Sequence, residues 1–175
     1  MRGDRSSPRS TGLSSGTTAV AGMAQIFLSY ASEDGFEASL LQARLEHVLQ
    51  DLGVSVWTYE RNQNGDERSI AEALRDRIRS SSATIMLVSP FTLNGGATQW
   101  MELAYADAYD VPTFVLLHHL AYDELKQSHH GVPPLLMQGQ CTAAKNWRTI
   151  EEDLRRVCNY VSLVARVADE RIENE

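Results

Sequence analysis

Residues 25–59 read QIFLSYASEDGFEASLLQARLEHVLQDLGVSVWTY, and this stretch decides the predicted fold. It opens with a short apolar run, 25–30, which is typical of a buried strand. Four aliphatic residues then recur with the spacing of one helix face: Leu41, Leu45, Val48 and Leu52. Gly53 is a typical helix C-cap, and the β-branched and aromatic run 54–59 predicts a second strand. Strand, helix and strand in this order predict a right-handed βαβ unit with parallel strands.

Alternation of strands and helices continues along the rest of the chain. Apolar runs predict strands at 84–89 and 113–117, and a shorter run predicts a fifth strand at 135–137. Further helices are predicted from a capping box of Ser69 and Glu72, over 98–109, over 122–126, and from 146 onward. We therefore expect an α/β fold of the flavodoxin-like type. Its five-stranded, mainly parallel sheet has the order 2-1-3-4-5, with helices on both faces.

Composition limits the class of protein. The chain has 175 residues, 43% of them hydrophobic, which suits one globular domain, predicted over 23–175, after a disordered tail at 1–22. A net charge of −7 argues against a nucleic-acid partner, and the absence of any apolar run of 18 residues argues against a membrane partner. Cys141 and Cys158 match no metal or redox spacing. We expect a cytoplasmic protein.

A ligand site is expected at the carboxyl ends of the strands, between the first and third strands, where the strand order reverses. Six residues fall on this rim: Tyr30, Ser32, Ser89, Phe91, Trp100 and Glu102. Glu102 is expected in the first turn of its helix, where the helix dipole favours the ionised carboxylate that a nucleophile or a partner for a developing cation needs. The alternative is that Glu102 is an ordinary early-helix residue and that Trp100 covers the sheet edge.

An ordered set of motifs resembles a known family. It comprises Ser-Tyr-x-Ser-x-Asp at 29–34, Gly-Val-x-Val-Trp at 53–57, Gly-Asp at 65–66, Ser-Ser at 81–82 and Leu-Val-Ser-Pro at 87–90. Over roughly 24–120 the chain resembles a Toll/interleukin-1 receptor (TIR) domain of the bacterial kind. This resemblance implies cleavage of NAD⁺ at the nicotinamide–ribose bond, giving ADP-ribose or a cyclic ADP-ribose-type signal.

In that family a glutamate of the helix after the third strand is catalytic, and this position falls on Glu102. The usual pattern has a tryptophan four residues before the glutamate, whereas Trp100 here is two before it. The stretch 96–106, GATQWMELAYA, also resembles the catalytic segment of nucleoside 2-deoxyribosyltransferases, which direct a helix-start glutamate at a sugar C1′. Deoxyribosyl transfer is therefore a competing activity.

NAD⁺ cleavage needs few groups, because neutral nicotinamide leaves without a proton and one carboxylate can suffice. Candidates to hold the nicotinamide are aromatic: Tyr30, Trp57, Phe91 and Trp100. Trp57 has the same strand parity as Tyr59 and can equally belong to the core. Ser32 and Ser89 are candidates for ribose or phosphate, and the backbone of 94–96, expected in a loop, is a candidate for the pyrophosphate.

The resemblance also implies partners. In the family the loop at 60–66 mediates assembly, so Arg61 and Asp66 are expected to support a homo-oligomer, with a separate sensor or effector protein, in antiphage defence. The alternatives are a solvated loop, or an adaptor that assembles without catalysis. NAD⁺ is expected as a substrate, with no cofactor, and no metal site is expected. Neighbouring strand residues such as His118 and His119 point to opposite faces and cannot jointly chelate a metal.

Overall fold

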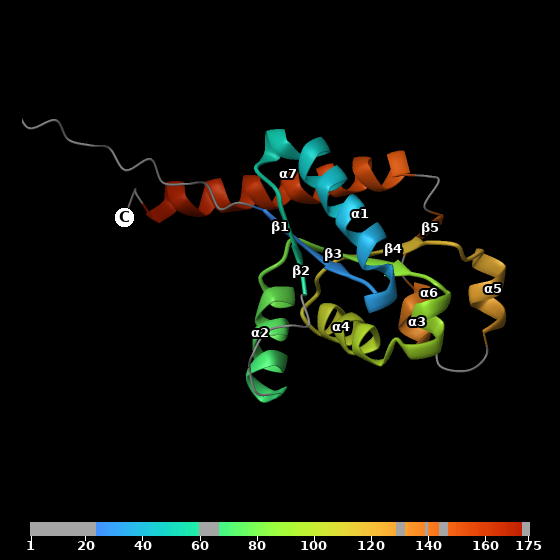
Figure 1. Cartoon of the computed structure of the whole chain (residues 1–175). Coiled ribbons are helices and arrows are strands. Elements are labelled where there is room, and N and C mark those ends of the chain that lie inside the picture. The colour runs from blue at the N-terminus through green and yellow to red at the C-terminus, as the bar shows by residue number, and fades with distance from the viewer. Residues whose placement is uncertain (1–23, 60–66, 129–131, 139, 144–146, 173–175) are drawn as a thin grey trace, which may run out of the picture.

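The computed structural model describes residues 24–59, 67–128, 132–138, 140–143 and 147–172 (Figure 1). The predicted tail at 1–22 and the loop residues Arg61 and Asp66 lie outside these ranges. None of the helices in the described ranges combines the length and the apolar character that a bilayer crossing requires.

A five-stranded parallel sheet forms the centre of the molecule. Its strands are β1 (Gln25–Ser29), β2 (Ser55–Thr58), β3 (Ala83–Val88), β4 (Thr113–Leu117) and β5 (Gln140–Ala143). They lie in the order β2-β1-β3-β4-β5, and every neighbouring pair is parallel. The predicted fold class and strand order are confirmed. Because the order reverses between β1 and β3, the crevice rule places a ligand site at the ends of these two strands.

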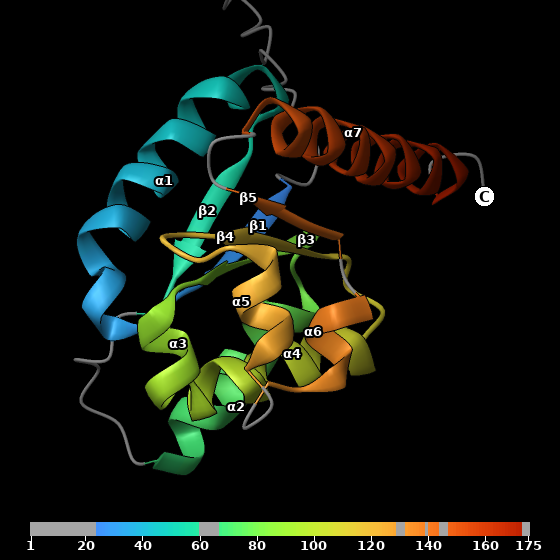
Figure 2. The same ribbon diagram turned by 90° about the vertical axis from the view of Figure 1, so that its right-hand side faces the viewer.

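Helices cover both faces of the sheet (Figure 2). They are α1 (Gly35–Val48), α2 (Glu67–Arg79), α3 (Pro90–Gly95), α4 (Ala97–Ala108), α5 (Tyr122–Gln127), α6 (Pro134–Gln138) and α7 (Trp147–Ile172). Two 3₁₀ turns, η1 (Ser32–Asp34) and η2 (Gln50–Leu52), flank α1. Helices α1 and α7 lie on one face, and the remaining helices lie on the other.

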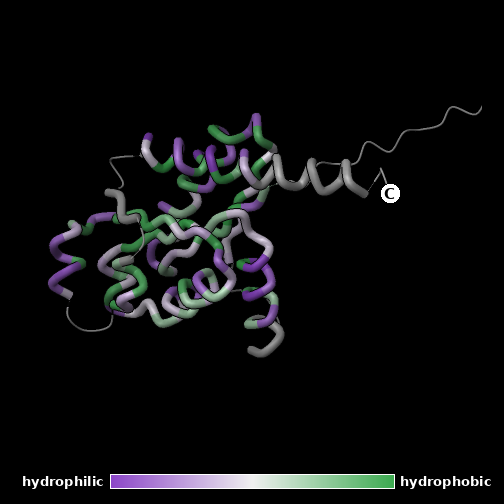
Figure 3. The backbone as a smooth tube through the Cα atoms, turned by 180° about the vertical axis from the view of Figure 1, so that it is seen from behind, coloured by the Kyte–Doolittle hydropathy of each residue, from purple (hydrophilic) through white to green (hydrophobic). Residues whose placement is uncertain are grey.

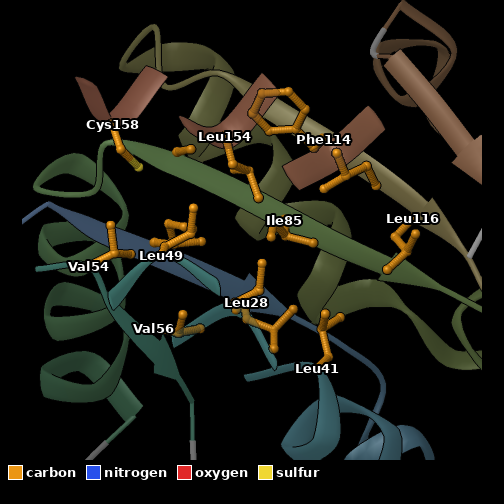
Figure 4. Packing of buried hydrophobic residues seen from close by; sticks show 14 of the residues in the cluster. Leu28, Leu41, Leu49, Val54, Val56, Ile85, Phe114, Leu116, Leu154 and Cys158 are labelled. Carbon is orange, nitrogen blue, oxygen red and sulfur yellow. The ribbon is translucent and has the colours of Figure 1, made fainter. Parts of the chain in front are cut away.

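The two faces have differently organised cores. On the α1 and α7 face one continuous cluster joins strands to both helices, through residues such as Leu28, Leu41, Ile85, Leu116 and Leu154 (Figure 4). On the other face the apolar residues form two clusters, one around Met86 and Leu103 and one around Phe27 and Leu74. The most hydrophilic segments lie on outer helices such as α2 and α5 (Figure 3).

Most boundaries differ from the predictions by one or two residues, and three differences matter for the fold. Residues 90–95, predicted as a loop, form α3, because Ser89 caps the helix and Pro90 suits its first position. Residues 135–137, predicted as a strand, lie in α6, and β5 follows at 140–143. A short apolar run does not distinguish a strand from a buried helix turn. Helix α2 begins at Glu67, two residues before the predicted cap.

Gly53 has the conformation expected of a C-cap. Its φ of 63° is left-handed, and its amide donates to the carbonyl of Gln50 at the end of η2. The first helical segment therefore ends here, and β2 can start two residues later. The predicted role of this glycine is confirmed.

Candidate functional site

A buried serine–glutamate pair lies at the sheet's switch point. Ser29 is the last residue of β1, and its hydroxyl donates to Glu102 Oε2 on α4. The two residues are 2% and 4% exposed. Ser29 has the strand parity of Phe27, so it faces the side of the sheet where α4 lies. The topology thus brings the predicted carboxylate to the carboxyl end of β1.

Glu102 is not a first-turn residue. Helix α4 begins at Ala97, after the N-cap Gly96, so Glu102 is its sixth residue, and the first turn carries no acidic side chain. The expectation that the helix dipole holds its charge is therefore wrong, because the dipole acts mainly within the first turn. Helix α4 begins too early for Glu102 to fall in its first turn, because α3 and α4 are separated only by Gly96. A hydroxyl donor from β1 interacts with the carboxylate instead.

A second serine–carboxylate pair lies beyond the end of β3. The Ser89 hydroxyl donates to Asp34 Oδ2 at 2.6 Å, and both residues are buried. Ser89 Oγ also accepts from the amide of Phe91 at 3.1 Å, and the Ser89 amide donates to Thr92 Oγ1 at 3.1 Å. Ser89 therefore caps α3 and ties it to the start of α1. Binding of a ribose hydroxyl by Ser89 would require this network to open.

Gln99 is a further buried polar residue on α4, one turn before Glu102. Its Nε2 donates to the carbonyl of Leu87 at 3.1 Å, and the residue is 2% exposed. Within the described part of the chain, Gln99 Oε1 has no hydrogen-bond partner. Residues three apart on a helix lie on the same side, so a free acceptor lies beside the Glu102 position.

Ser29, Asp34 and Gln99 were missed as site residues by sequence reasoning. Ser29 and Asp34 were visible as the two ends of the Ser-Tyr-x-Ser-x-Asp motif, but the motif alone did not assign them partners. Gln99 carried no sequence signal beyond its place on the predicted helix. Contacts that join residues 73 or 55 positions apart become visible only in three dimensions.

The aromatic candidates are distributed over different clusters. Trp57 stacks on Phe27, with ring centroids 5.4 Å apart, and Arg77 lies 5.5 Å from its ring. Trp100 packs with the cluster around Met86 on the same face of the sheet. Residues two apart on a helix do not face each other, so Trp100 and Glu102 point in different directions. These contacts place both tryptophans against the core.

The other rim candidates are more accessible or lie on the opposite face. Phe91 is 50% exposed, directly after Ser89. Ser32 is exposed, and its hydroxyl donates to Glu33 at 2.9 Å. Tyr30 is partly buried against the cluster on the α1 and α7 face. The structure thus brings Ser89 and Phe91 into contact and joins Glu102 to Ser29.

Residues 94 and 95 belong to α3, and Gly96 is the single turn residue between α3 and α4, so no open loop is present at 94–96. The Gly96 amide donates to the carbonyl of Thr92 at 2.9 Å, so that amide is already used. A Cβ at Gly96 would lie 2.4 Å from the same oxygen, which leaves room for glycine alone. This close approach explains the glycine without a phosphate ligand.

Histidine pairs do not form a metal cluster in the described ranges, where no three His, Cys, Asp or Glu side chains gather as ligands. The expectation that His118 and His119 lie on a strand and point to opposite faces is wrong, because both follow the end of β4 and His119 has a left-handed φ of 50°. Their ring centroids lie 4.1 Å apart, and His118 Nε2 lies 4.0 Å from a Glu37 oxygen. His129 and His130 lie outside the described residues.

Similarity to solved structures is distant. A 2-deoxyribosyltransferase from Leishmania mexicana is 19% identical, with a TM-score of 0.45, over 54% of this chain and 64% of that chain. The chain thus spans less than two thirds of that protein's length. The 2-deoxyribosyltransferase of Bacillus psychrosaccharolyticus is 16% identical, with a TM-score of 0.46, over 73% and 90% of the two chains. The TIR domains of the Roq1 resistosome are 15% identical, with a TM-score of 0.44, over 82% and 84%.

These likenesses concern the fold alone. No curated protein sequence matches the chain significantly. Residues 26–129, more than half of the chain, match the family described as TIR domain. This match covers β1 to β4, the switch point and both serine–carboxylate pairs. The chain therefore belongs to the TIR domain family.

Proposed function

We propose that the protein cleaves the nicotinamide–ribose bond of NAD⁺, with Glu102 as the catalytic residue. The observation that carries this proposal is the position of Glu102. It is a carboxylate at the switch point of a parallel sheet, held by a neutral hydroxyl. TIR domains are often NADases, and the family membership supports the same reaction class.

The reaction makes limited demands on the protein. As the C1′–N bond breaks, its electron pair goes to the nicotinamide ring nitrogen, which becomes neutral, and positive charge develops on the ribose. Glu102 stabilises this cation or bonds to C1′. Water then adds at C1′ and loses a proton, giving ADP-ribose, and a carboxylate that had bonded to C1′ leaves with the electron pair of that bond. Attack by an adenine nitrogen instead of water gives a cyclic product.

We assign substrate contacts to residues of the predicted rim and of α4. Phe91 and Tyr30 offer aromatic surface, Ser32 offers a hydroxyl, and Gln99 Oε1 offers a buried acceptor for an N–H or O–H of the substrate. Glu102 is 4% exposed, so the residues that cover it must move before a dinucleotide reaches it. Trp57 and Ser89 have structural contacts that they would have to share with substrate.

The test is release of nicotinamide from NAD⁺ by the purified chain, followed by mass analysis of the second product. The Glu102→Gln variant keeps an acceptor for Ser29 but loses the charge. Glu152→Gln, on the exposed side of α7, is the matched control for the same chemical change. Release by the wild type and by Glu152→Gln, but not by Glu102→Gln, supports the proposal. Release that is unchanged in Glu102→Gln contradicts it.

A second candidate is deoxyribosyl transfer, which is favoured by the stretch 96–106 around Glu102. A base-exchange assay with a deoxynucleoside and a second free base distinguishes it from NAD⁺ cleavage. Exchange without nicotinamide release would replace the leading proposal with this one.

We also propose that the domain works as an assembly, since TIR domains commonly form oligomers, and that its NAD⁺ chemistry serves antiphage defence with a separate sensor or effector protein. A non-catalytic adaptor would use the same assembly without turnover. Light scattering on wild type, Arg61→Ala and Asp66→Ala tests the 60–66 loop as the contact. Phage plating on bacteria that express the protein distinguishes an enzyme from an adaptor. An enzyme protects the bacteria as wild type but not as Glu102→Gln, whereas an adaptor protects them in either version.

A further inference from the structure

We infer that Ser29 is a positioning residue that fixes the Glu102 carboxylate for reaction at the sugar carbon. This inference rests on the proposed function and adds a residue to it. It starts from one contact, in which the Ser29 hydroxyl donates to Glu102 Oε2 while both residues are almost fully excluded from solvent.

The position of the Ser29 hydroxyl is set by the sheet. β1 lies between β2 and β3, and Ser29 pairs with Met86 of β3 in the parallel register. Pairing with β2 ends one residue earlier, at Leu28, so Ser29 is held by β3 on one side and by a doubly paired residue before it, which leaves its backbone little freedom. A short side chain on such a backbone has few positions for its oxygen. Ser29 is therefore a fixed point against which a longer side chain can be oriented.

Glu102 needs such a fixed point. Its backbone is held by α4, whose neighbouring residues Leu103 and Ala106 are buried in the two clusters on this face. Its side chain has three rotatable bonds, which allow the carboxylate several positions. Burial of a charged carboxylate also requires donors to replace water. The Ser29 bond supplies a donor and selects among those positions.

The donor is neutral, and this has a chemical consequence. An arginine in the same place would hold the carboxylate but would also offset its charge. A hydroxyl orients the carboxylate without itself offsetting the negative charge that stabilises the cation developing on the ribose. Ser29 thus acts through Glu102, without a role for its own oxygen in bond making.

The test compares NAD⁺ cleavage by wild type, Ser29→Ala, Ser29→Thr and Ser39→Ala. Ser39 is an exposed serine on α1 and serves as the matched control. Because misplacing a reacting group by about 1 Å costs about 100-fold, we expect Ser29→Ala to lower kcat by about 10- to 100-fold, with KM changed less than about threefold. Ser29→Thr retains the hydroxyl and is expected to recover most of the rate. Ser29→Cys, a weaker donor of similar size, replaces Ser29→Thr if thermal unfolding shows that the extra methyl destabilises the fold.

A double-mutant cycle separates positioning from a general structural role. If Ser29 acts through Glu102, adding Ser29→Ala to Glu102→Gln changes the residual rate less than about twofold. Equal rates for Ser29→Ala and wild type, or an additive loss in the double variant, overturn the inference while leaving NAD⁺ cleavage in place. Absence of nicotinamide release by the wild type itself overturns the proposed function and the inference together.

Discussion

Two pairs with the same chemistry, Ser29–Glu102 and Ser89–Asp34, lie on either side of the switch point. In the first, a central strand is joined to the second turn of a long helix. In the second, the residue after β3 is joined to the turn before α1, and the same serine caps α3. The first pair therefore connects elements that are already fixed, while the second pair connects the segments that leave the sheet. We infer that the first serves the reaction and the second the fold.

The strongest test of these two roles is to remove the negative charge of Glu102 or of Asp34 while keeping a side-chain oxygen that accepts the serine hydroxyl. Glu102→Gln is expected to lower kcat for NAD⁺ cleavage by about 1,000-fold or more, because it removes the group that stabilises the ribosyl cation. Asp34→Asn is expected to retain activity within about tenfold, because charge at a distance contributes less than charge at the reacting carbon. Nicotinamide release measured at saturating NAD⁺ checks both. A larger loss in Asp34→Asn than in Glu102→Gln would reverse the assignment.

Removing each hydroxyl should affect stability in the opposite order. Ser89→Ala removes the helix cap and leaves buried Asp34 without its donor, so we expect a loss of about 3 kcal/mol in the free energy of unfolding. Ser29→Ala also takes a donor from a buried carboxylate but removes no helix cap, so we expect a smaller loss of about 2 kcal/mol. Urea unfolding followed by circular dichroism measures both variants. Equal losses would show that the two pairs contribute alike to the fold.

The junction between α3 and α4 provides a smaller test, because it places both pairs relative to each other. Gly96→Ala puts a methyl group into the carbonyl of Thr92, so we expect the backbone to shift at a cost of about 1 to 3 kcal/mol. Gly95→Ala is the matched control, since a Cβ there has nothing within 4 Å. The melting temperatures of the two variants should therefore differ. Activity should also fall more in Gly96→Ala, because α4 carries Glu102.

Much of the fold was predictable because its signals are local. Apolar runs and the glycine at 53 predicted β1 to β4 and their order, and the sheet confirmed them. The fifth strand was expected at 135–137, where α6 lies, because these residues are apolar enough for either structure. The position of Glu102 at the rim followed from topology. Its exact turn, its burial and its partner Ser29 did not, because they depend on where α3 ends and how α4 packs.

Cys158 is a third buried ionisable side chain, and no hydroxyl among the described residues donates to it. Cys158 of α7 is fully buried in the cluster beneath α1 and α7, and desolvation raises the pKa of its thiol from 9.0 to about 11. The thiol therefore stays neutral in the folded protein where an exposed cysteine would ionise. We expect Cys158 to react with a thiol reagent at pH 8 only after the protein unfolds. The Cys158→Ala variant is the control, because the additional reaction on unfolding should be absent from it.

The same shift gives the smallest expected effect, a pH dependence of stability. Well below pH 9 the thiol is protonated in both states and contributes no dependence. Between about pH 9 and 11 the unfolded chain releases a proton that the folded chain keeps, so the free energy of unfolding falls as the pH rises. Urea unfolding of wild type and Cys158→Ala at pH 8 and pH 10 isolates this contribution. The wild type should lose more stability than the variant between the two pH values. If wild type and Cys158→Ala lose the same free energy of unfolding between pH 8 and pH 10, the thiol contacts water in the folded state. Burial on the α1 and α7 face would then be less complete than burial of Glu102 and Asp34.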